Sequence, residues 1–284
     1  MSTQPHKNQL APRPNPIPKG EWLANYLLRA PVFFLTTAIF GSLSLLASLW
    51  DKSGKQQHAI AQHWGRAITR ISGARIAVIN AQYLDGSVAV YASNHLSYMD
   101  TPVIFGTLPF QFRIVARHEL FKLPFIGWHL TRSGQVPVNV TNPRASIASL
   151  SSAVRTLKAG LPVFIFPEGG RTETGHLETF LNGPAFMAIR AQVPIVPMAL
   201  IGTHELLPMH TSVFHPVPVT LAVGEPIETA GYSMRQIDEL TARLRDAIGS
   251  LFYRYSYLEP PTSPQPLAPS VRSELETITL EEQK

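Results

Sequence analysis

Short apolar segments recur along the middle of the chain, and most are bounded by glycine, proline or asparagine. They are four to six residues long and rich in valine, isoleucine and phenylalanine. Apolar runs of this length are typical of β-strands that are buried on both faces of a sheet. The predicted strands are Ala74–Ile79, Val88–Ala92, Phe112–Ala116, Gln135–Val138, Pro162–Phe166, Ile195–Leu200 and Val219–Val223.

Between these segments the spacing of apolar residues changes to that of a helix with one buried face. The predicted helices are Lys55–Ile71, Ala145–Lys158, Pro184–Ala191 and Ser233–Tyr253. Alternating strands and helices predict an α/β fold with a mostly parallel central sheet flanked by helices. Such sheets bind ligands at the carboxyl ends of their strands, so the residues just after each strand are the first candidates for function.

The N-terminal part of the chain contains a run of twenty residues without charge, Pro31–Trp50. A helix of this length reaches roughly 30 Å, about the thickness of the hydrocarbon core of a bilayer. Trp22, Tyr26 and Trp50 stand at its ends, where aromatic side chains favour the membrane interface. We expect a helical membrane anchor that either spans the bilayer or forms a hairpin in one leaflet with its bend at Gly41-Ser42. A buried core helix is the alternative.

The two ends of the chain differ from its middle in composition. Residues 1–19 hold five prolines and three basic residues, whereas residues 259–284 hold five glutamates against one arginine and one lysine. We expect four regions: a disordered basic, proline-rich arm (1–20), the membrane anchor (21–52), the catalytic domain (53–258) and a disordered acidic tail (259–284). Basic residues on both sides of the anchor favour a catalytic domain on the cytoplasmic face of the membrane.

Composition narrows the classes of function further. The chain has 284 residues, of which 45% are hydrophobic and 15% charged, which is enough for a large hydrophobic core. It contains no cysteine, which excludes disulfides, thiolate catalysis and cysteine-based metal sites. The formal net charge is +5, but lysine and arginine are scattered rather than clustered, which argues against nucleic acid as a partner.

Two polar groups that suit acid–base chemistry follow the strand Val88–Ala92. His95 and Asp100 are five residues apart. Ser97 and Thr101-Pro102 are signals for a helix that begins near Ser97 or Asp100. A turn at His95 followed by this helix would bring the imidazole to the carboxylate. A histidine held in this way by one nitrogen can take a proton from a hydroxyl with the other.

A second candidate group follows the strand Pro162–Phe166. Glu168 can accept a hydrogen bond from a substrate hydroxyl, Gly169 and Gly170 let the backbone approach a ligand, and Arg171 can hold a phosphate with two parallel hydrogen bonds. Taken alone, the first group is better explained by a helix cap beside a loop histidine, and the second by a glycine turn with a solvated ion pair.

Both groups together resemble the glycerolipid acyltransferases of the 1-acylglycerol-3-phosphate (lysophosphatidate) acyltransferase family, over about Trp64 to Pro226. Four segments match in order and spacing: Asn94-His95-x-Ser97-x-x-Asp100, Arg117-x-Glu119-Leu120-x-x-x-Pro124-x-x-Gly127-Trp128, Phe166-Pro167-Glu168-Gly169-x-Arg171 and Val193-Pro194-Ile195-Val196-Pro197.

The resemblance implies a membrane-bound enzyme that transfers a fatty acyl group from acyl-CoA or an acyl-carrier protein to lysophosphatidate, which gives phosphatidic acid. It implies that His95 is the catalytic base and that Asp100 orients it, with no metal and no cofactor. The implied substrate-binding residues are Asn94, Ser97, Arg117, Arg144, Glu168, Gly169, Gly170 and Arg171. Val193, Pro194, Ile195, Val196 and Pro197 form the implied acyl-donor region.

The chain departs from the family at two positions that usually carry a positive charge. Val140 follows Asn139 where the family has arginine, and Leu181 stands where it has lysine. Arg144 or Arg117 could compensate. The departures leave two alternatives open: transfer to a different lysolipid, such as a lyso amino-acid lipid, or a catalytically silent lipid-binding scaffold.

Overall fold

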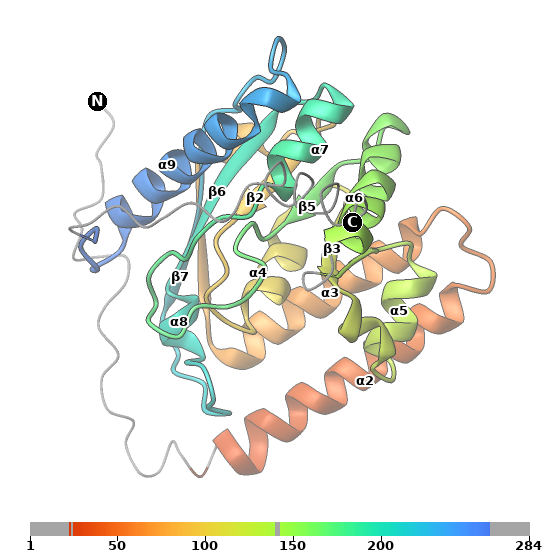
Figure 1. The fold of residues 1–284 in the computed structure, drawn as a ribbon. Helices are drawn as coiled ribbons and strands as arrows, with labels where there is room; N and C mark the ends of the chain where they lie inside the picture. The colour runs from red at the N-terminus through yellow and green to blue at the C-terminus, as the bar shows by residue number, and fades with distance from the viewer. Residues whose placement is uncertain (1–22, 24, 140–142, 262–284) are drawn as a thin grey trace, which may run out of the picture.

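The computed structural model describes residue 23, residues 25–139 and residues 143–261. Within them, seven strands form one sheet in the order β1-β7-β6-β2-β5-β3-β4 (Figure 1). Neighbouring strands are parallel, except β6 and β7, which are antiparallel. The strands are β1 (Arg75–Ile79), β2 (Val90–Ser93), β3 (Arg113–Arg117), β4 (Val136–Val138), β5 (Val163–Ile165), β6 (Ile195–Ile201) and β7 (Pro218–Val223).

The α-helices lie mainly in the intervals between the strands, as the apolar pattern predicts, and 3-10 and π-helical turns add to them. They are α2 (Ala30–Ala47), α3 (Lys55–Ser72), α4 (Asp100–Thr107), α5 (Ile126–Arg132), α6 (Pro143–Lys158), α7 (Gly183–Ala191), α8 (Thr203–Leu206) and α9 (Ile237–Tyr255). The shorter turns are η2 (Asn25–Arg29), η3 (Ala81–Tyr83), η4 (His118–Lys122) and η5 (Met234–Gln236). The predicted α/β fold with a mostly parallel sheet is confirmed.

Helices cover both faces of the sheet and divide the hydrophobic core in two. Residues of α6, α7 and α9 pack on one face together with Val90 and Ala92. Residues of α3 and α4 pack on the other face together with Tyr91, the residue between them in β2. Because successive side chains of a strand point to opposite faces, a central strand such as β2 is apolar at every position. This explains why the sequence shows continuous rather than alternating apolar runs.

The helices α3 and α4 cross at two glycines. A Cβ atom on Gly65 would lie 2.5 Å from Pro102 O and 2.6 Å from Gly106 N, so no larger residue fits there. The close crossing fixes the position of α4, whose first residue is Asp100. A contact far from the sheet edge therefore determines where one of the candidate catalytic side chains lies.

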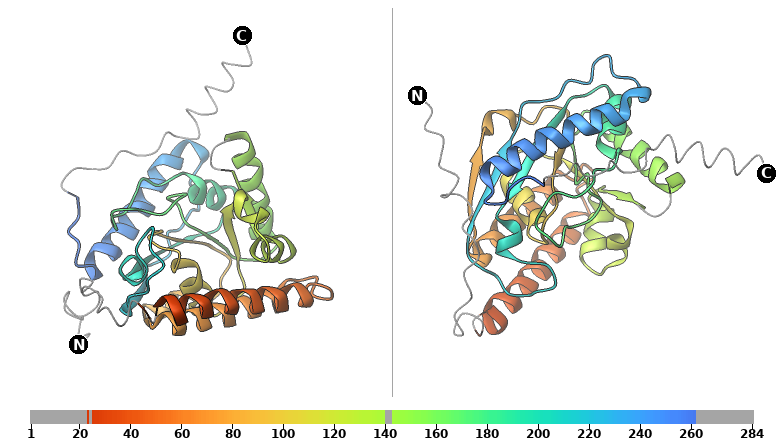
Figure 2. Two further views of the ribbon diagram at one scale, coloured as in Figure 1. Left: turned by 90° about the horizontal axis from the view of Figure 1, so that it is seen from below. Right: turned by 60° about the vertical axis from the view of Figure 1, so that its left-hand side comes forward.

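The apolar N-terminal segment forms one continuous helix that lies lengthwise against the domain. Figure 2 shows α2 along an outer edge of the molecule next to α3. The helix runs through Gly41 and Ser42, so the hairpin bend predicted there is wrong, and the chain turns instead between Ala47 and Lys55. Upstream of Pro31 the chain continues as the π-helical turn η2.

The segment Asn25–Ala47 is long and apolar enough to cross a membrane, with a mean hydropathy of 1.8 over 23 residues. Few of its side chains are buried, and Phe34, Leu35 and Ile39 are exposed, which excludes the alternative of a buried core helix. The predicted disordered arm (1–20) and nearly all of the acidic tail lie outside the described residues, as does Val140.

Candidate active site

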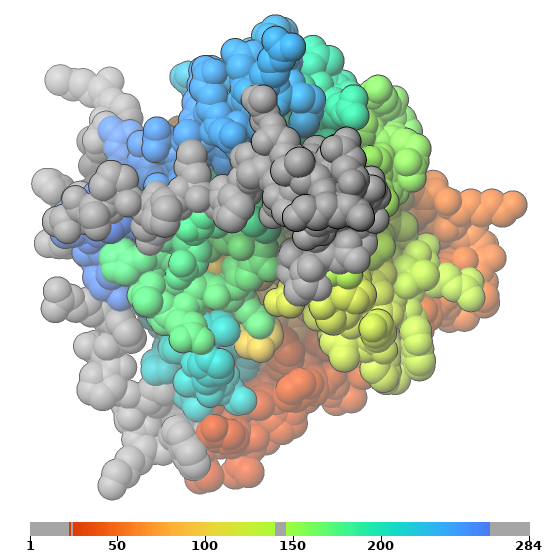
Figure 3. Space-filling model, in the orientation of Figure 1, coloured from red at the N-terminus to blue at the C-terminus, as the bar shows by residue number. Residues whose placement is uncertain are grey.

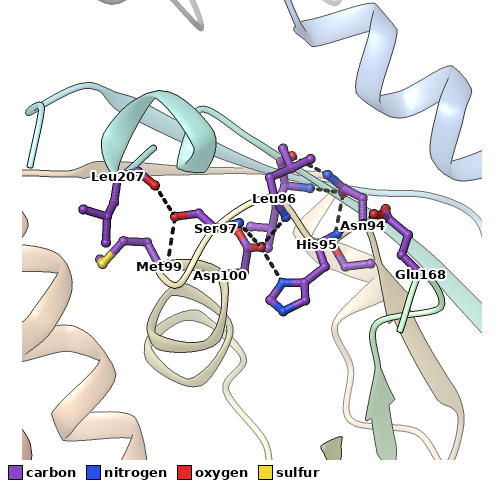
Figure 4. A network of polar contacts seen from close by, with 10 residues as sticks. Asn94, His95, Leu96, Ser97, Met99, Asp100, Glu168 and Leu207 are labelled. Carbon is purple, nitrogen blue, oxygen red and sulfur yellow. Dashed lines mark hydrogen bonds and ion pairs between the residues drawn. The ribbon is translucent and has the colours of Figure 1, made fainter. Parts of the chain in front are cut away.

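The turn after β2 brings His95 and Asp100 together at the carboxyl edge of the sheet (Figure 4). His95 Nδ1 lies 2.7 Å from Asp100 Oδ2. Because a carboxylate only accepts hydrogen bonds, Nδ1 carries the proton and Nε2 keeps its lone pair. The sequence-based expectation of a turn at His95 followed by a helix is met, since α4 begins at Asp100.

Asp100 is held by the backbone of the same turn. Its Oδ2 atom also accepts hydrogen bonds from the N–H groups of Leu96 (2.6 Å) and Ser97 (2.8 Å). The side chain is fully buried, and Oδ1 has no hydrogen-bond partner among the described residues. Three donors on one oxygen fix the carboxylate, and through it the imidazole, before any substrate arrives.

The imidazole of His95 is packed on one face and open at its edge. Its ring stacks on Phe166 with 4.0 Å between the ring centroids and 9° between the planes. The side chain remains 18% exposed. Phe166 thus prevents rotation of the ring, while a hydroxyl group can still approach the imidazole from solvent.

Asn94 and Ser97 are buried, and both are engaged with the protein backbone. Asn94 Nδ2 donates to Leu200 O at 2.9 Å, and its Oδ1 accepts from Leu200 N at 2.8 Å. Ser97 Oγ donates to Leu207 O and accepts from Met99 N. These hydrogen bonds fix the His95 turn against β6 and the segment after it, and the predicted substrate contacts of the two residues stay a prediction.

The loop after β5 joins the same turn. The N–H group of His95 donates to Glu168 Oε1 at 3.2 Å, and the N–H group of Thr172 donates to His95 O at 3.2 Å. Gly169 has a φ of 68°, a conformation that favours glycine, and its N–H group donates to Phe166 O. A Cβ atom on Gly170 would meet nothing within 4 Å, so a ligand has room to approach its backbone.

Glu168 lies in an unusual electrostatic environment for a carboxyl group. Burial raises its pKa well above the ordinary value, and the nearby carboxylates of Asp100 and Glu178 raise it further, against a hydrogen bond from His95 N–H. Its Oε2 atom is buried without a hydrogen-bond partner among the described residues. A neutral Glu168 would carry a proton that can be donated to a ligand oxygen.

The three candidate arginines differ in their placement. Arg171 is half-buried beside the site, with its guanidinium over the ring of Tyr98. Arg117 is exposed at the end of β3 and lies 3.6 Å from Glu119. Arg144 is in the first turn of α6, but its side chain lies outside the described residues. Of the two candidate arginines whose side chains the structure describes, Arg171 is the one in the loop that bonds to the His95 turn.

The predicted acyl-donor segment is found inside the sheet instead of at the site. Ile195 and Val196 pair with Val90 and Tyr91 of β2 and are buried in the two halves of the core. Val193 and Pro194 precede β6, at the amino edge of its pairing with β2 and opposite His95. The segment thus forms the start of a central strand, and its predicted contact with the acyl donor stays a prediction.

Sequence reasoning missed Phe166, Tyr98 and Thr172 as parts of the site. Each is next to or within a matched segment, but their contacts join residues about 70 positions apart in the chain. A single sequence contains no signal that such distant positions are in contact. An aromatic residue between Ser97 and Met99 was the available signal for Tyr98.

The geometry agrees with what the comparisons with known proteins show. Residues 75–201 match the family model described as Acyltransferase, and this range contains the His95 turn and the Glu168 loop. Over these residues the chain is similar to acyltransferases. The resemblance noted in the sequence is thereby confirmed.

The similar proteins include plant 1-acyl-sn-glycerol-3-phosphate acyltransferases. One from Limnanthes douglasii is 33% identical over 159 residues, which is 56% of this chain and 57% of that protein. One from Cocos nucifera is 29% identical over 206 residues, which is 72% of this chain and 67% of that protein. The chain thus spans little more than half the length of the first of these relatives.

A solved structure shows the same fold. The 1-acyl-sn-glycerophosphate acyltransferase PlsC from Thermotoga maritima superposes with a TM-score of 0.68 and 24% sequence identity, over 81% of this chain and 95% of that one. The similarity supports the arrangement of sheet and helices in this chain.

Proposed function

We propose that this acyltransferase moves a fatty acyl group from a thioester donor to the free hydroxyl of 1-acylglycerol-3-phosphate, which gives phosphatidic acid for phospholipid biosynthesis. The observation that carries the proposal is the His95–Asp100 pair, 2.7 Å apart, with the imidazole edge open beside Glu168 and Arg171. The names of the plant relatives support the choice of acceptor.

In the proposed reaction His95 acts as a general base. Nε2 takes the proton of the acceptor hydroxyl while that oxygen forms a bond to the thioester carbonyl carbon. The tetrahedral intermediate then expels the thiolate, which receives the proton from His95. Asp100 stabilises the imidazolium that forms in between, as a buried carboxylate does in other histidine-based sites. The steps need no covalent acyl-enzyme, metal or cofactor.

The acceptor is assigned by the residues beside His95. The guanidinium of Arg171 suits the phosphate because its planar N–H groups form two parallel hydrogen bonds to phosphate oxygens. Glu168 positions the glyceryl part, with its buried Oε2 atom as the group that meets a hydroxyl. Arg117 and Arg144 are candidates for a second contact with the phosphate. The donor is acyl-CoA or an acyl-carrier protein.

We also propose that α2 holds the enzyme on a membrane, with the catalytic domain on the cytoplasmic face. In Figure 3 the turn between β2 and α4 reaches the surface on the same face that α2 borders. Three polar contacts tie the helix and the turn before it to the domain: Asn25 with the backbone of Phe214, Thr37 with Trp64, and Ser44 with His129. A helix fixed along its length favours an in-plane position in one leaflet over a span.

An acceptor panel tests the proposed function. The detergent-purified protein is given a radiolabelled acyl donor, either acyl-CoA or an acylated carrier protein. Each donor is tested with three acceptors of equal chain length: lysophosphatidate, a lyso amino-acid lipid and monoacylglycerol. We expect the highest kcat/KM with lysophosphatidate and a labelled phosphatidic acid product. A higher kcat/KM with the amino-acid lipid would mean that this lipid, and not lysophosphatidate, is the acceptor. Binding of these lipids without turnover of any would identify a scaffold instead of an enzyme.

A further inference from the structure

The guanidinium of Arg171 lies directly over an aromatic ring. Its Cζ atom is 3.4 Å from the centroid of the Tyr98 ring, within the range of a close cation–π contact. Tyr98 comes from the turn after β2, whereas Arg171 comes from the loop after β5. The contact therefore joins the segment that carries the base to the segment that carries the cation.

The backbone around Tyr98 is rigid although its ring is 54% exposed. Ser97 before it is fully buried and bonded to Leu207 O, and Met99 after it is fully buried. The side chain is therefore presented at the surface from a fixed turn. Its ring offers a flat platform close to His95, three positions earlier in the chain.

The backbone of Arg171 is fixed relative to His95 as well. The next residue, Thr172, donates its N–H group to His95 O. Beyond its backbone, however, an arginine side chain has several freely rotating bonds, and ordering them on binding costs conformational entropy. Within the described residues its guanidinium forms no ion pair, so its N–H groups remain available to an anion.

We propose that Tyr98 is a positioning residue that holds the Arg171 guanidinium in place beside His95, so that the phosphate of the acceptor meets a charge that is already oriented. The inference rests on the proposed function, because it concerns the recognition of a phosphate-bearing acceptor. It also accounts for how one arginine serves a site in which Leu181 replaces a family lysine. A stack leaves the edges of the guanidinium plane, where its N–H groups point, free for phosphate oxygens.

The test compares two substitutions at Tyr98. Tyr98→Leu removes the π-face, and we expect KM for lysophosphatidate to rise about 3- to 30-fold, the range of a cation–π contact, with kcat changed less than threefold. Tyr98→Phe keeps the π-face and should restore the wild-type KM. Because the ring is exposed, neither variant should change the melting temperature.

Two further comparisons separate positioning from direct contact with substrate. With monoacylglycerol, which has no phosphate, Tyr98→Leu should change KM less than twofold. In an Arg171→Ala background, Tyr98→Leu should have no further effect on lysophosphatidate. A KM for Tyr98→Phe as high as that for Tyr98→Leu would assign the role to the hydroxyl group and overturn the proposal. An equal loss on both acceptors would overturn it as well.

A measurement without turnover distinguishes failure of this inference from failure of the proposed function. In nitrogen-15-labelled protein in detergent, the Arg171 Hε resonance should be shifted upfield by the ring current of Tyr98. Tyr98→Leu should abolish this shift, and Tyr98→Phe should keep it. An unshifted wild-type resonance overturns the stacking. A shifted resonance in a protein that does not acylate lysophosphatidate would confirm the stack of Arg171 on Tyr98. It would overturn the proposal that the acceptor carries a phosphate.

Discussion

The carboxylate of Asp100 accepts hydrogen bonds from His95 and from the backbone of its own turn with the same oxygen atom. Oδ2 accepts from His95 Nδ1 and from the N–H groups of Leu96 and Ser97. An oxygen of an asparagine side chain could accept from the same backbone donors. The charge of Asp100 is therefore separable by mutation from its structural role.

This separation gives a prediction at the residue scale. Asp100→Asn should lower kcat about 100-fold, because the neutral amide no longer stabilises the imidazolium that forms during proton transfer. KM for the lipid acceptor should change little, and circular dichroism should show a folded protein. A variant with kcat within threefold of the wild type would mean that the charge of Asp100 does not take part in the reaction.

At this scale the sequence predicts where the candidate catalytic residues lie better than it predicts which atoms the neighbouring residues contact. The His95–Asp100 pair follows from spacing and helix signals, and the position of Glu168 follows from its place after a strand. Asn94 and Ser97 were assigned to substrate, although their polar atoms bond to the backbone of Leu200 and Leu207. Those partners are more than 100 residues away in the chain. Only the folded chain reveals that their hydrogen-bonding capacity is already in use.

At the scale of elements, strands are predicted well and short helices poorly. Every predicted strand is present because buried strands need apolar residues on both faces. The helix α5 was not predicted, since it is seven residues long and begins after Phe125, which has a positive φ of 60°. A Cβ atom on Gly127 would lie 2.3 Å from Phe121 O. The glycine in the matched Pro124-x-x-Gly127-Trp128 segment is therefore explained by the close approach of α5 to η4.

A buried histidine, His58, and a half-buried one, His129, lie where α3 and α5 meet the rest of the domain. His129 on α5 shares a hydrogen bond of 2.6 Å with Ser44 of α2, and His58 on α3 donates from Nε2 to Phe110 O. Burial, together with a smaller effect of the charge of the nearby Arg113, lowers the pKa of each to about 4. Both histidines are thus neutral in the folded protein at neutral pH.

The lowered pKa values predict a loss of stability in mild acid. Between about pH 6.5 and pH 4 the unfolded chain binds protons at these histidines and the folded protein does not. The free energy of unfolding therefore decreases as the pH is lowered through this range. Each histidine contributes a slope of up to about 1.4 kcal/mol per pH unit. Chemical unfolding in detergent at several pH values measures the slope.

Matched variants isolate the contribution of one histidine. His129→Gln should reduce the slope by up to the same amount, whereas His63→Gln, at an exposed position on α3, should leave it unchanged. An identical slope for the wild type and His129→Gln would show that His129 titrates normally in the folded protein. The contact between α2 and α5 would then have to be reconsidered.

At the scale of the whole molecule, the order and direction of the strands bring the candidate catalytic residues to one edge of the sheet. The strands that carry His95, Glu168 and Arg117 are parallel, so their carboxyl ends meet at one edge of the sheet. The sequence predicts this edge from strand–helix alternation. It does not predict that β7 runs antiparallel to β6 or that α2 lies along α3, because both depend on packing between distant segments.

The position of α2 predicts membrane binding through its exposed face. Phe34, Leu35 and Leu46 are 70%, 62% and 54% exposed, so replacing all three with aspartate should leave the domain folded. Charges within the apolar part of a membrane are costly, and the variant should no longer float with liposomes that the wild type binds. Equal flotation of both proteins at equal melting temperature would rule out this face as the anchor.

The central claim is that His95 is the base in acyl transfer to lysophosphatidate. The most direct measurement is the initial rate at which purified wild type and His95→Ala form labelled phosphatidic acid from acyl-CoA and lysophosphatidate in mixed micelles. Removal of a general base costs about 10²- to 10⁴-fold, so we expect His95→Ala to lose at least 99% of the rate while it keeps its melting temperature. A folded His95→Ala protein that retains more than about a tenth of the wild-type rate would contradict the mechanism.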